Sequence, residues 1–114
     1  MLANLNSSST SSKIWEALPI QGTANTWGDE IYFEIPVVAE LDPDARVDVH
    51  VGELGYWPVG HAFCIFFGPT PVSPDGRPRA ASPVNILGRL KGDATQFGLV
   101  SAGTLVSVTR TNQS

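Results

Sequence analysis

The run Ala62–Phe67, with the sequence AFCIFF, is apolar at every position. A strand that faces solvent on one side alternates apolar and polar residues, so an unbroken apolar run of this length predicts a strand covered on both faces. Its cysteine, Cys64, is the only one in the chain. We expect Cys64 to be an unreactive core residue, because burial raises the pKa of a thiol.

Several half-buried strands are predicted around this central one. Residues 30–35 place Ile31 and Phe33 on one face and Glu30 and Glu34 on the other. The two glutamates are either an acid and base pair or, as we prefer, the solvent-facing side of the strand. Residues 47–51, 84–90 and 104–110 predict further strands, and a short one is expected between residues 20 and 27.

Helices are predicted to be few and short, because nine prolines and eleven glycines interrupt the chain. Residues 12–18 and 94–100 each have a capping residue before them and a stop signal after them. Residues 68–83 contain five prolines and predict a stiff loop. The pattern as a whole indicates an all-β fold, namely a closed or nearly closed antiparallel β-barrel with one or two short helices.

Composition narrows the range of partners. The 114 residues fit one domain, and the net charge of −4 comes without a cluster of lysine and arginine. We therefore expect no nucleic acid and no membrane as partners. One cysteine and two histidines are too few to suggest a metal site, and we expect no cofactor. No apolar span of membrane length is present, so we expect a cytoplasmic location.

Aromatic residues and prolines gather beside the predicted turns, which is typical of an apolar pocket with a few hydrogen-bonding groups. A barrel end plugged by aromatic side chains is the alternative. Arg89 is placed where it can clamp an anion or an amide, or pair with Glu30 or Glu34. The predicted ligand-binding residues are Tyr56, Trp57, Phe67, Thr70, Asn85 and Arg89.

Three segments carry a resemblance to a known family: TWGDEIYFEIPV (26–37), GYWPVGHAFCIFFGPTP (55–71) and RAASPVNILGRLKGD (79–93). Together they resemble the bacterial and archaeal cyclophilin-like domain family over most of the chain, from about Ile14 to Arg110. The resemblance implies a cyclophilin-like β-barrel, which we assign to residues 13–110. It leaves a polar N-terminal segment over residues 1–12, where a first strand is either missing or replaced, and a polar tail over residues 111–114.

Three functions follow as hypotheses. The leading one is a binding module for a small molecule or a proline-containing peptide segment. The second is a peptidyl-prolyl isomerase with Arg89 as the catalytic candidate, although the Phe-His-Arg motif of true cyclophilins is absent. The third is an interaction protein that associates with a partner, or with itself, through an open sheet edge.

Overall fold

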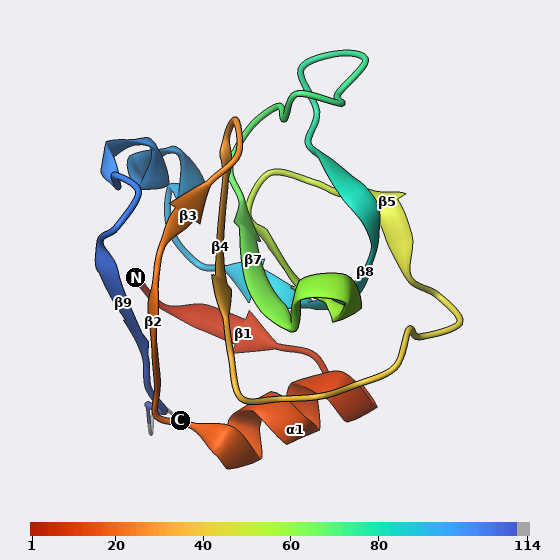
Figure 1. Ribbon diagram of the computed structural model, residues 1–114, viewed down its shortest axis with the longest axis vertical. Helices are drawn as coiled ribbons and strands as arrows, with labels where there is room; N and C mark the ends of the chain where they lie inside the picture. The colour runs from red at the N-terminus through yellow and green to blue at the C-terminus, as the bar shows by residue number, and fades with distance from the viewer. Residues whose placement is uncertain (112–114) are drawn as a thin grey trace.

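Strand β7 (Ala62–Phe66) lies inside the main sheet, between β6 (Glu53–Trp57) and β4 (Glu30–Glu34). The computed structural model describes residues 1–111, and its architecture is drawn in Figure 1. The side chains of β7 alternate between two apolar clusters. Phe63 and Ile65 belong to the first cluster, and Cys64 and Phe66 belong to the second cluster. This confirms the expectation that the apolar run is covered on both faces and that Cys64 is buried.

The main sheet is antiparallel and has the strand order β1-β8-β6-β7-β4-β3. The remaining strands of this sheet are β1 (Ala3–Leu5), β8 (Arg79–Leu90) and β3 (Asn25–Thr26). Strand β5 (Arg46–Asp48) lies off this order and pairs with β8. A separate two-stranded sheet is formed by β2 (Ile20–Thr23) and β9 (Leu105–Val108).

The expected closed barrel is not observed. The two ends of the main sheet, β1 and β3, do not pair with each other, so no sheet in residues 1–111 closes on itself. The physical reason is local, because β3 is only two residues long and the preceding strand β2 pairs with β9 instead of extending the main sheet. The protein is mostly β with one main helix.

That helix, α1 (Ser9–Ala17), crosses one end of the sheet, and the loop over residues 67–78 lies at the opposite end (Figure 1). Helix α1 begins three residues earlier than predicted, because the Ser8 hydroxyl accepts a hydrogen bond of 3.2 Å from the backbone N–H of Ser11 and so caps the helix. Two short 3-10 helices are η1 (Pro58–Gly60) and η2 (Ala94–Leu99), the second over the predicted segment. No helix among the described residues is long and apolar enough to cross a membrane.

The expected N-terminal segment, residues 1–12, contributes β1 and the first part of α1. Strand β1 pairs with the end of β8, and a Cβ atom on Gly88 would collide with the backbone oxygen of Asn4. Gly88 adopts a φ of 152°, and the pairing between β6 and β8 shifts register beside it. This bulge turns Leu87 into the first cluster. Of the expected tail over residues 111–114, all but Thr111 lies outside the described residues.

Strands β5, β6 and β8 depart clearly from the sequence predictions. Strand β6 was not expected, since Gly52, Gly55 and Pro58 resemble turn residues. The Gly55 position has a packing reason, because a Cβ atom there would lie 3.0 Å from the Cγ2 atom of Val84. Strand β5 is shorter than predicted, and β8 is longer, since it begins at Arg79 and continues through Pro83.

Candidate functional site

A pocket of about 190 Å³ lies between the β3–β4 hairpin, the end of β6 and the first half of β8. Its walls are mostly apolar and aromatic, and they include one carboxyl group. We call it the Glu30 pocket, and it is lined by Trp27, Glu30, Tyr32, Trp57, Ala80, Ala81 and Val84.

The hairpin between β3 and β4 positions Trp27 and Glu30 side by side. Their backbones exchange two hydrogen bonds, of 3.0 and 3.2 Å, around a two-residue turn. Gly28 takes a φ of 58° in that turn, which favours glycine, and a Cβ atom there would lie 2.9 Å from the Cα atom of Thr70. The sequence Trp27-Gly28-Asp29-Glu30 thus allows a tight turn that packs against the 67–78 loop.

The indole of Trp57 is held by contacts on different sides. Its Nε1 atom donates a hydrogen bond of 2.6 Å to the Oγ atom of Ser82 on β8. Gly60 leaves room for the ring, because a Cβ atom there would lie 2.8 Å from the indole carbons. The ring of Tyr32 meets it edge to face, with centroids 6.3 Å apart and an angle of 78° between the planes. Two perpendicular aromatic rings therefore form a corner of the pocket.

Glu30 is the polar group of this pocket, and its position corrects the sequence interpretation. It was expected on a solvent-facing side of the strand, yet only 6% of its surface is exposed, since the second cluster covers that face of β4. Burial raises the pKa of Glu30 to about 7, and a hydrogen bond with the Cys64 thiol lowers it in part. Burial and the neighbouring Glu30 in turn raise the pKa of Cys64 well above its ordinary value.

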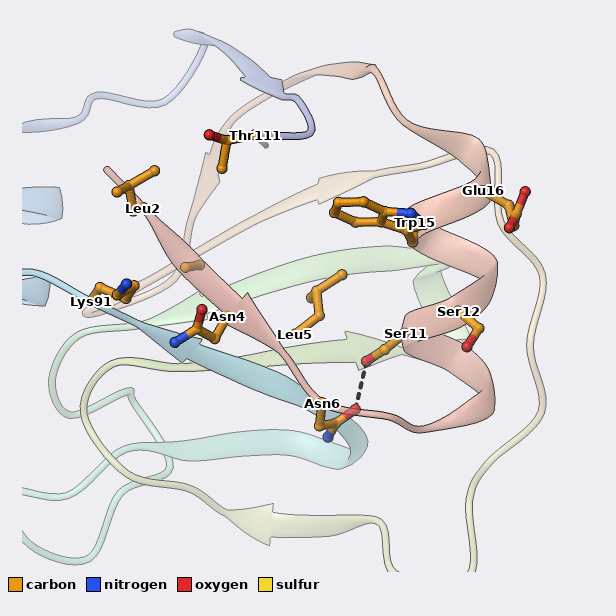
Figure 2. A pocket seen from close by; sticks show the side chains of 11 residues that line it. Leu2, Asn4, Leu5, Asn6, Ser11, Ser12, Trp15, Glu16, Lys91 and Thr111 are labelled. Carbon is orange, nitrogen blue, oxygen red and sulfur yellow. Dashed lines mark hydrogen bonds between the residues drawn. The ribbon is translucent and has the colours of Figure 1, made fainter. Parts of the chain in front are cut away.

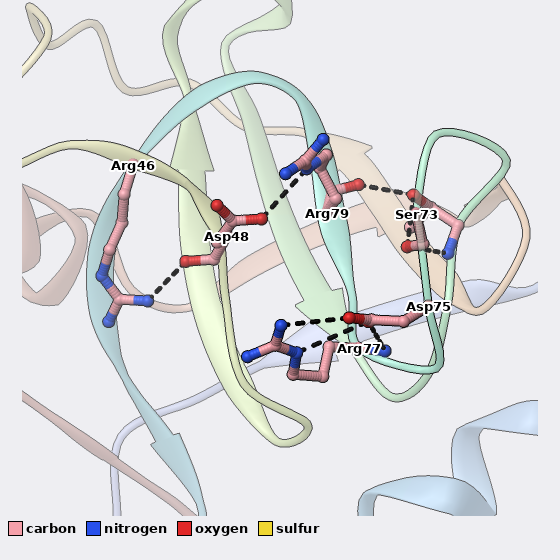
Figure 3. A network of polar contacts seen from close by, with 7 residues as sticks. Arg46, Asp48, Ser73, Asp75, Arg77 and Arg79 are labelled. Atoms are coloured by element: carbon pink, nitrogen blue, oxygen red, sulfur yellow. Dashed lines mark hydrogen bonds and ion pairs between the residues drawn. The ribbon is translucent and has the colours of Figure 1, made fainter.

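The arginines around β5 and the start of β8 form ion pairs with acids other than Glu30. Figure 3 shows Arg79 beside Asp48 and Arg77 beside Asp75, with N–O distances of 3.0 Å in both pairs. Arg46 binds the carboxylate of Glu53 through both of its terminal nitrogens, at 3.0 and 2.8 Å. Burial favours the neutral form of Glu53, but hydrogen bonds from Arg46 and His50 outweigh it and lower its pKa. No ion pair among residues 1–111 involves Glu30.

The six residues predicted for ligand binding do not line one cavity. Trp57 lines the Glu30 pocket. Tyr56, the next residue on β6, is buried on the opposite face, where its hydroxyl donates a hydrogen bond of 2.7 Å to the carbonyl of Val37. Asn85 is also fully buried and binds the same segment between β4 and β5, because its Oδ1 atom accepts a hydrogen bond of 2.7 Å from the N–H of Asp42.

The other predicted residues are placed apart from the pocket. Phe67 belongs to the first cluster, and the Thr70 hydroxyl donates a hydrogen bond of 2.5 Å to the Arg79 carbonyl, which ties the loop to β8. Arg89 is exposed on β8, opposite Glu53 of β6, so it faces neither Glu30 nor Glu34 across a strand pair. Three residues of the pocket, Trp27, Glu30 and Tyr32, were not among the predicted ligand-binding residues, and the signal for them was their spacing around the Gly28-Asp29 turn.

A larger hollow of about 530 Å³ lies between β1 and α1 (Figure 2). Two of its polar side chains bind each other: the Oδ1 atom of Asn6 accepts a hydrogen bond of 2.7 Å from the Ser11 hydroxyl, and the Asn6 amide donates to the Ile86 carbonyl. Most of its lining residues are exposed. This groove is therefore open to solvent and has no buried carboxyl group among its lining residues, so we regard the smaller pocket as the candidate site.

Comparison with known proteins identifies the family. The family model described as Cyclophilin-like matches residues 1–109. The chain belongs to the cyclophilin-like family. A solved structure of a hypothetical protein from Archaeoglobus fulgidus is similar to this chain, with 39% sequence identity and a TM-score of 0.78, and the match covers 96% of this chain and 85% of that one. No functionally curated protein shows significant similarity. The cyclophilin-like resemblance of the sequence is thus confirmed.

Proposed function

We propose that this cyclophilin-like protein is a binding module that takes a small molecule, or one side chain of a peptide, into the Glu30 pocket. The observation that carries the proposal is Glu30, a residue only 6% exposed, at the wall of a pocket with two tryptophans and a tyrosine. Burying an ionisable group without a charged partner costs free energy, so a sequence optimised for stability alone would place an apolar residue there.

Tryptophan fluorescence provides a direct test. Of the three tryptophans, Trp27 and Trp57 line the pocket, whereas Trp15 is on α1 and 41% exposed. In a Trp15→Phe background the emission therefore reports the pocket. We expect ligands found by a thermal-shift screen to change this emission and to raise the melting temperature as their concentration increases.

Two variants decide whether the pocket is the site. Trp57→Ala should abolish both signals for those ligands, whereas Arg89→Ala, an exposed residue outside the pocket, should leave them unchanged. If a broad screen yields no stabilising ligand, or if Trp57→Ala lowers only the stability and retains binding, the proposal fails.

Prolyl isomerisation is less well supported by the same geometry. It requires a hydrogen-bond donor such as an arginine in an apolar groove, and none of the seven lining residues is an arginine. A protease-coupled assay on several Xaa-Pro peptides tests it, and catalysis that Arg89→Ala removes would revive it.

An interaction through a sheet edge has one supporting observation, because β1 ends the main sheet and pairs on one side only within the described residues. Light scattering over a range of concentrations tests this alternative, and a monomer at all concentrations argues against self-association.

A further inference from the structure

This inference rests on the proposed function and names the class of ligand. We propose that the Glu30 pocket binds an organic cation, a methylated ammonium group, whose charge lies beside the Glu30 carboxylate and whose methyl groups contact Trp27, Tyr32 and Trp57. The reasons are the charge of the pocket, the chemistry of its walls, and its size.

The pocket has one carboxylic acid and no basic side chain. Its other lining residues are apolar or aromatic, and Arg79, the cation next to Ala80 in the sequence, has its Nε atom 3.0 Å from a carboxylate oxygen of Asp48. An anionic ligand would meet the Glu30 carboxyl without a compensating positive charge. A cation instead supplies the partner that the described chain does not provide, and a buried carboxylate gains most from such a partner.

The aromatic walls favour the same sign of charge. The faces of Trp and Tyr rings carry negative electrostatic potential, and cages of such rings bind quaternary ammonium groups. Trp57 and Tyr32 stand at 78° to each other, so they present two differently oriented walls, and Trp27 adds a third aromatic side chain. Methyl groups on the nitrogen spread the charge and replace strongly hydrated N–H groups with apolar contacts.

Size limits the ligand to a small head group. A volume of about 190 Å³ corresponds to roughly six water molecules at liquid density. A trimethylammonium group with one or two further carbons fits this space, and a nucleotide or a multi-residue peptide does not. Ala80 and Ala81, the small residues on the β8 side, keep this space open.

The protonation state of Glu30 makes the proposal sensitive to pH. Among the ionisable groups of the strands around Glu30, Tyr32 on β4 lines the pocket and the Cys64 thiol on β7 contacts Glu30. The others are placed elsewhere, because Glu53 on β6 binds Arg46, Arg79 on β8 binds Asp48, and Glu34 on β4 and Arg89 on β8 are exposed. Since burial raises the pKa of Glu30 to about 7, the empty site holds a proton in mild acid. A cation must displace that proton, so its affinity should increase as the pH rises through 7.

The test compares choline with 3,3-dimethylbutan-1-ol, its neutral isostere, by pocket fluorescence in the Trp15→Phe protein. At pH 8.5 we expect choline to bind at least about tenfold more tightly than the alcohol. Lowering the pH to 5.5 should weaken choline roughly tenfold or more and leave the alcohol unchanged. Glu30→Gln should remove both the preference and the pH dependence while the alcohol still binds.

Equal affinities at pH 8.5, or tighter binding of the alcohol, would overturn the inference and leave the proposed function in place, because a ligand would still occupy the pocket. Failure of choline to bind would also overturn it. The proposed function is judged separately by the ligand screen and the Trp57→Ala variant, so the two failures are distinguishable.

Discussion

At the scale of the single residue, Glu30 is the group with the largest consequences. It belongs to an amphipathic strand, yet both faces of β4 are covered, and the carboxyl lies among aromatic rings beside a neutral thiol. Glu53 shows the alternative arrangement. It is as buried as Glu30, but Arg46 and His50 contact its carboxylate, and its pKa is lowered rather than raised. The difference between the two acids is the presence of a charged partner.

The stability of the protein should therefore depend on the protonation of Glu30. Its pKa is about 7 in the folded chain and near 4.5 when unfolded, so the folded state holds the proton more tightly. This contribution is complete below about pH 4.5 and is lost as the pH rises through 7. We expect it to lower the free energy of unfolding by about 2 to 3 kcal/mol between pH 5 and 8.

Urea denaturation at several pH values checks this expectation. The side chain of Glu30→Gln is neutral at every pH, so this variant should not lose stability as the pH rises and should be more stable than the wild type at pH 8. The difference between the two proteins isolates Glu30 from the two histidines. Glu34→Gln, an exposed acid on the same strand, is the matched control and should keep the wild-type slope. A constant difference between Glu30→Gln and wild type across this range would contradict the assignment.

At the scale of the element, glycines bring the backbones of separate strands into contact with large side chains. Gly22 of β2 lies over the ring of Phe33 in β4, where a Cβ atom would be 2.7 Å from the Cδ2 atom. This contact joins the small β2–β9 sheet to the main sheet through the first cluster. The strand cannot move away easily, because β2 pairs with β9 at four positions.

Gly22→Ala should lower the free energy of unfolding by about 1 to 3 kcal/mol, because the added methyl group displaces the Phe33 ring or the strand. Gly76→Ala is the control: nothing lies within 4 Å of its added Cβ atom, so we expect a change of less than about 0.5 kcal/mol. Chemical denaturation measures both values. Equal stability of the two variants would show that β2 adapts without cost.

At the scale of the whole molecule, two apolar clusters share their central strands. Phe63 and Phe66 are three residues apart on β7, are 4% and 0% exposed, and belong to different clusters. Because one strand enters both clusters, loss of packing on one face should disturb the other, and the protein should unfold as one cooperative unit.

Phe63→Ala and Phe66→Ala should each lower the free energy of unfolding by about 3 to 5 kcal/mol, as for large core truncations generally. Each variant should retain a single transition, with coincident curves from far-UV circular dichroism and tryptophan fluorescence. Two separated transitions in either variant would mean that the clusters fold independently.

The fold was predictable where a residue pattern is local and strong. The AFCIFF run predicted a doubly covered strand, Asp93 marked the cap of the second short helix, and the resemblance predicted the family. Strand β6 was missed because its glycines resemble turn signals, although Gly55 is there to admit Val84. The predicted closure of the sheet was wrong, since closure depends on which partner β2 selects, and no local pattern specifies that choice.

The candidate site follows the same division. By itself the sequence predicted the central strand, the burial of Cys64 and the aromatic residues that gather beside turns. Only the tertiary structure decided that Glu30 turns inward and that Trp57, rather than Tyr56 or Phe67, faces the pocket. The physical reason is that period-two alternation divides a strand into two faces, whereas which face meets solvent depends on segments that pack from elsewhere in the chain.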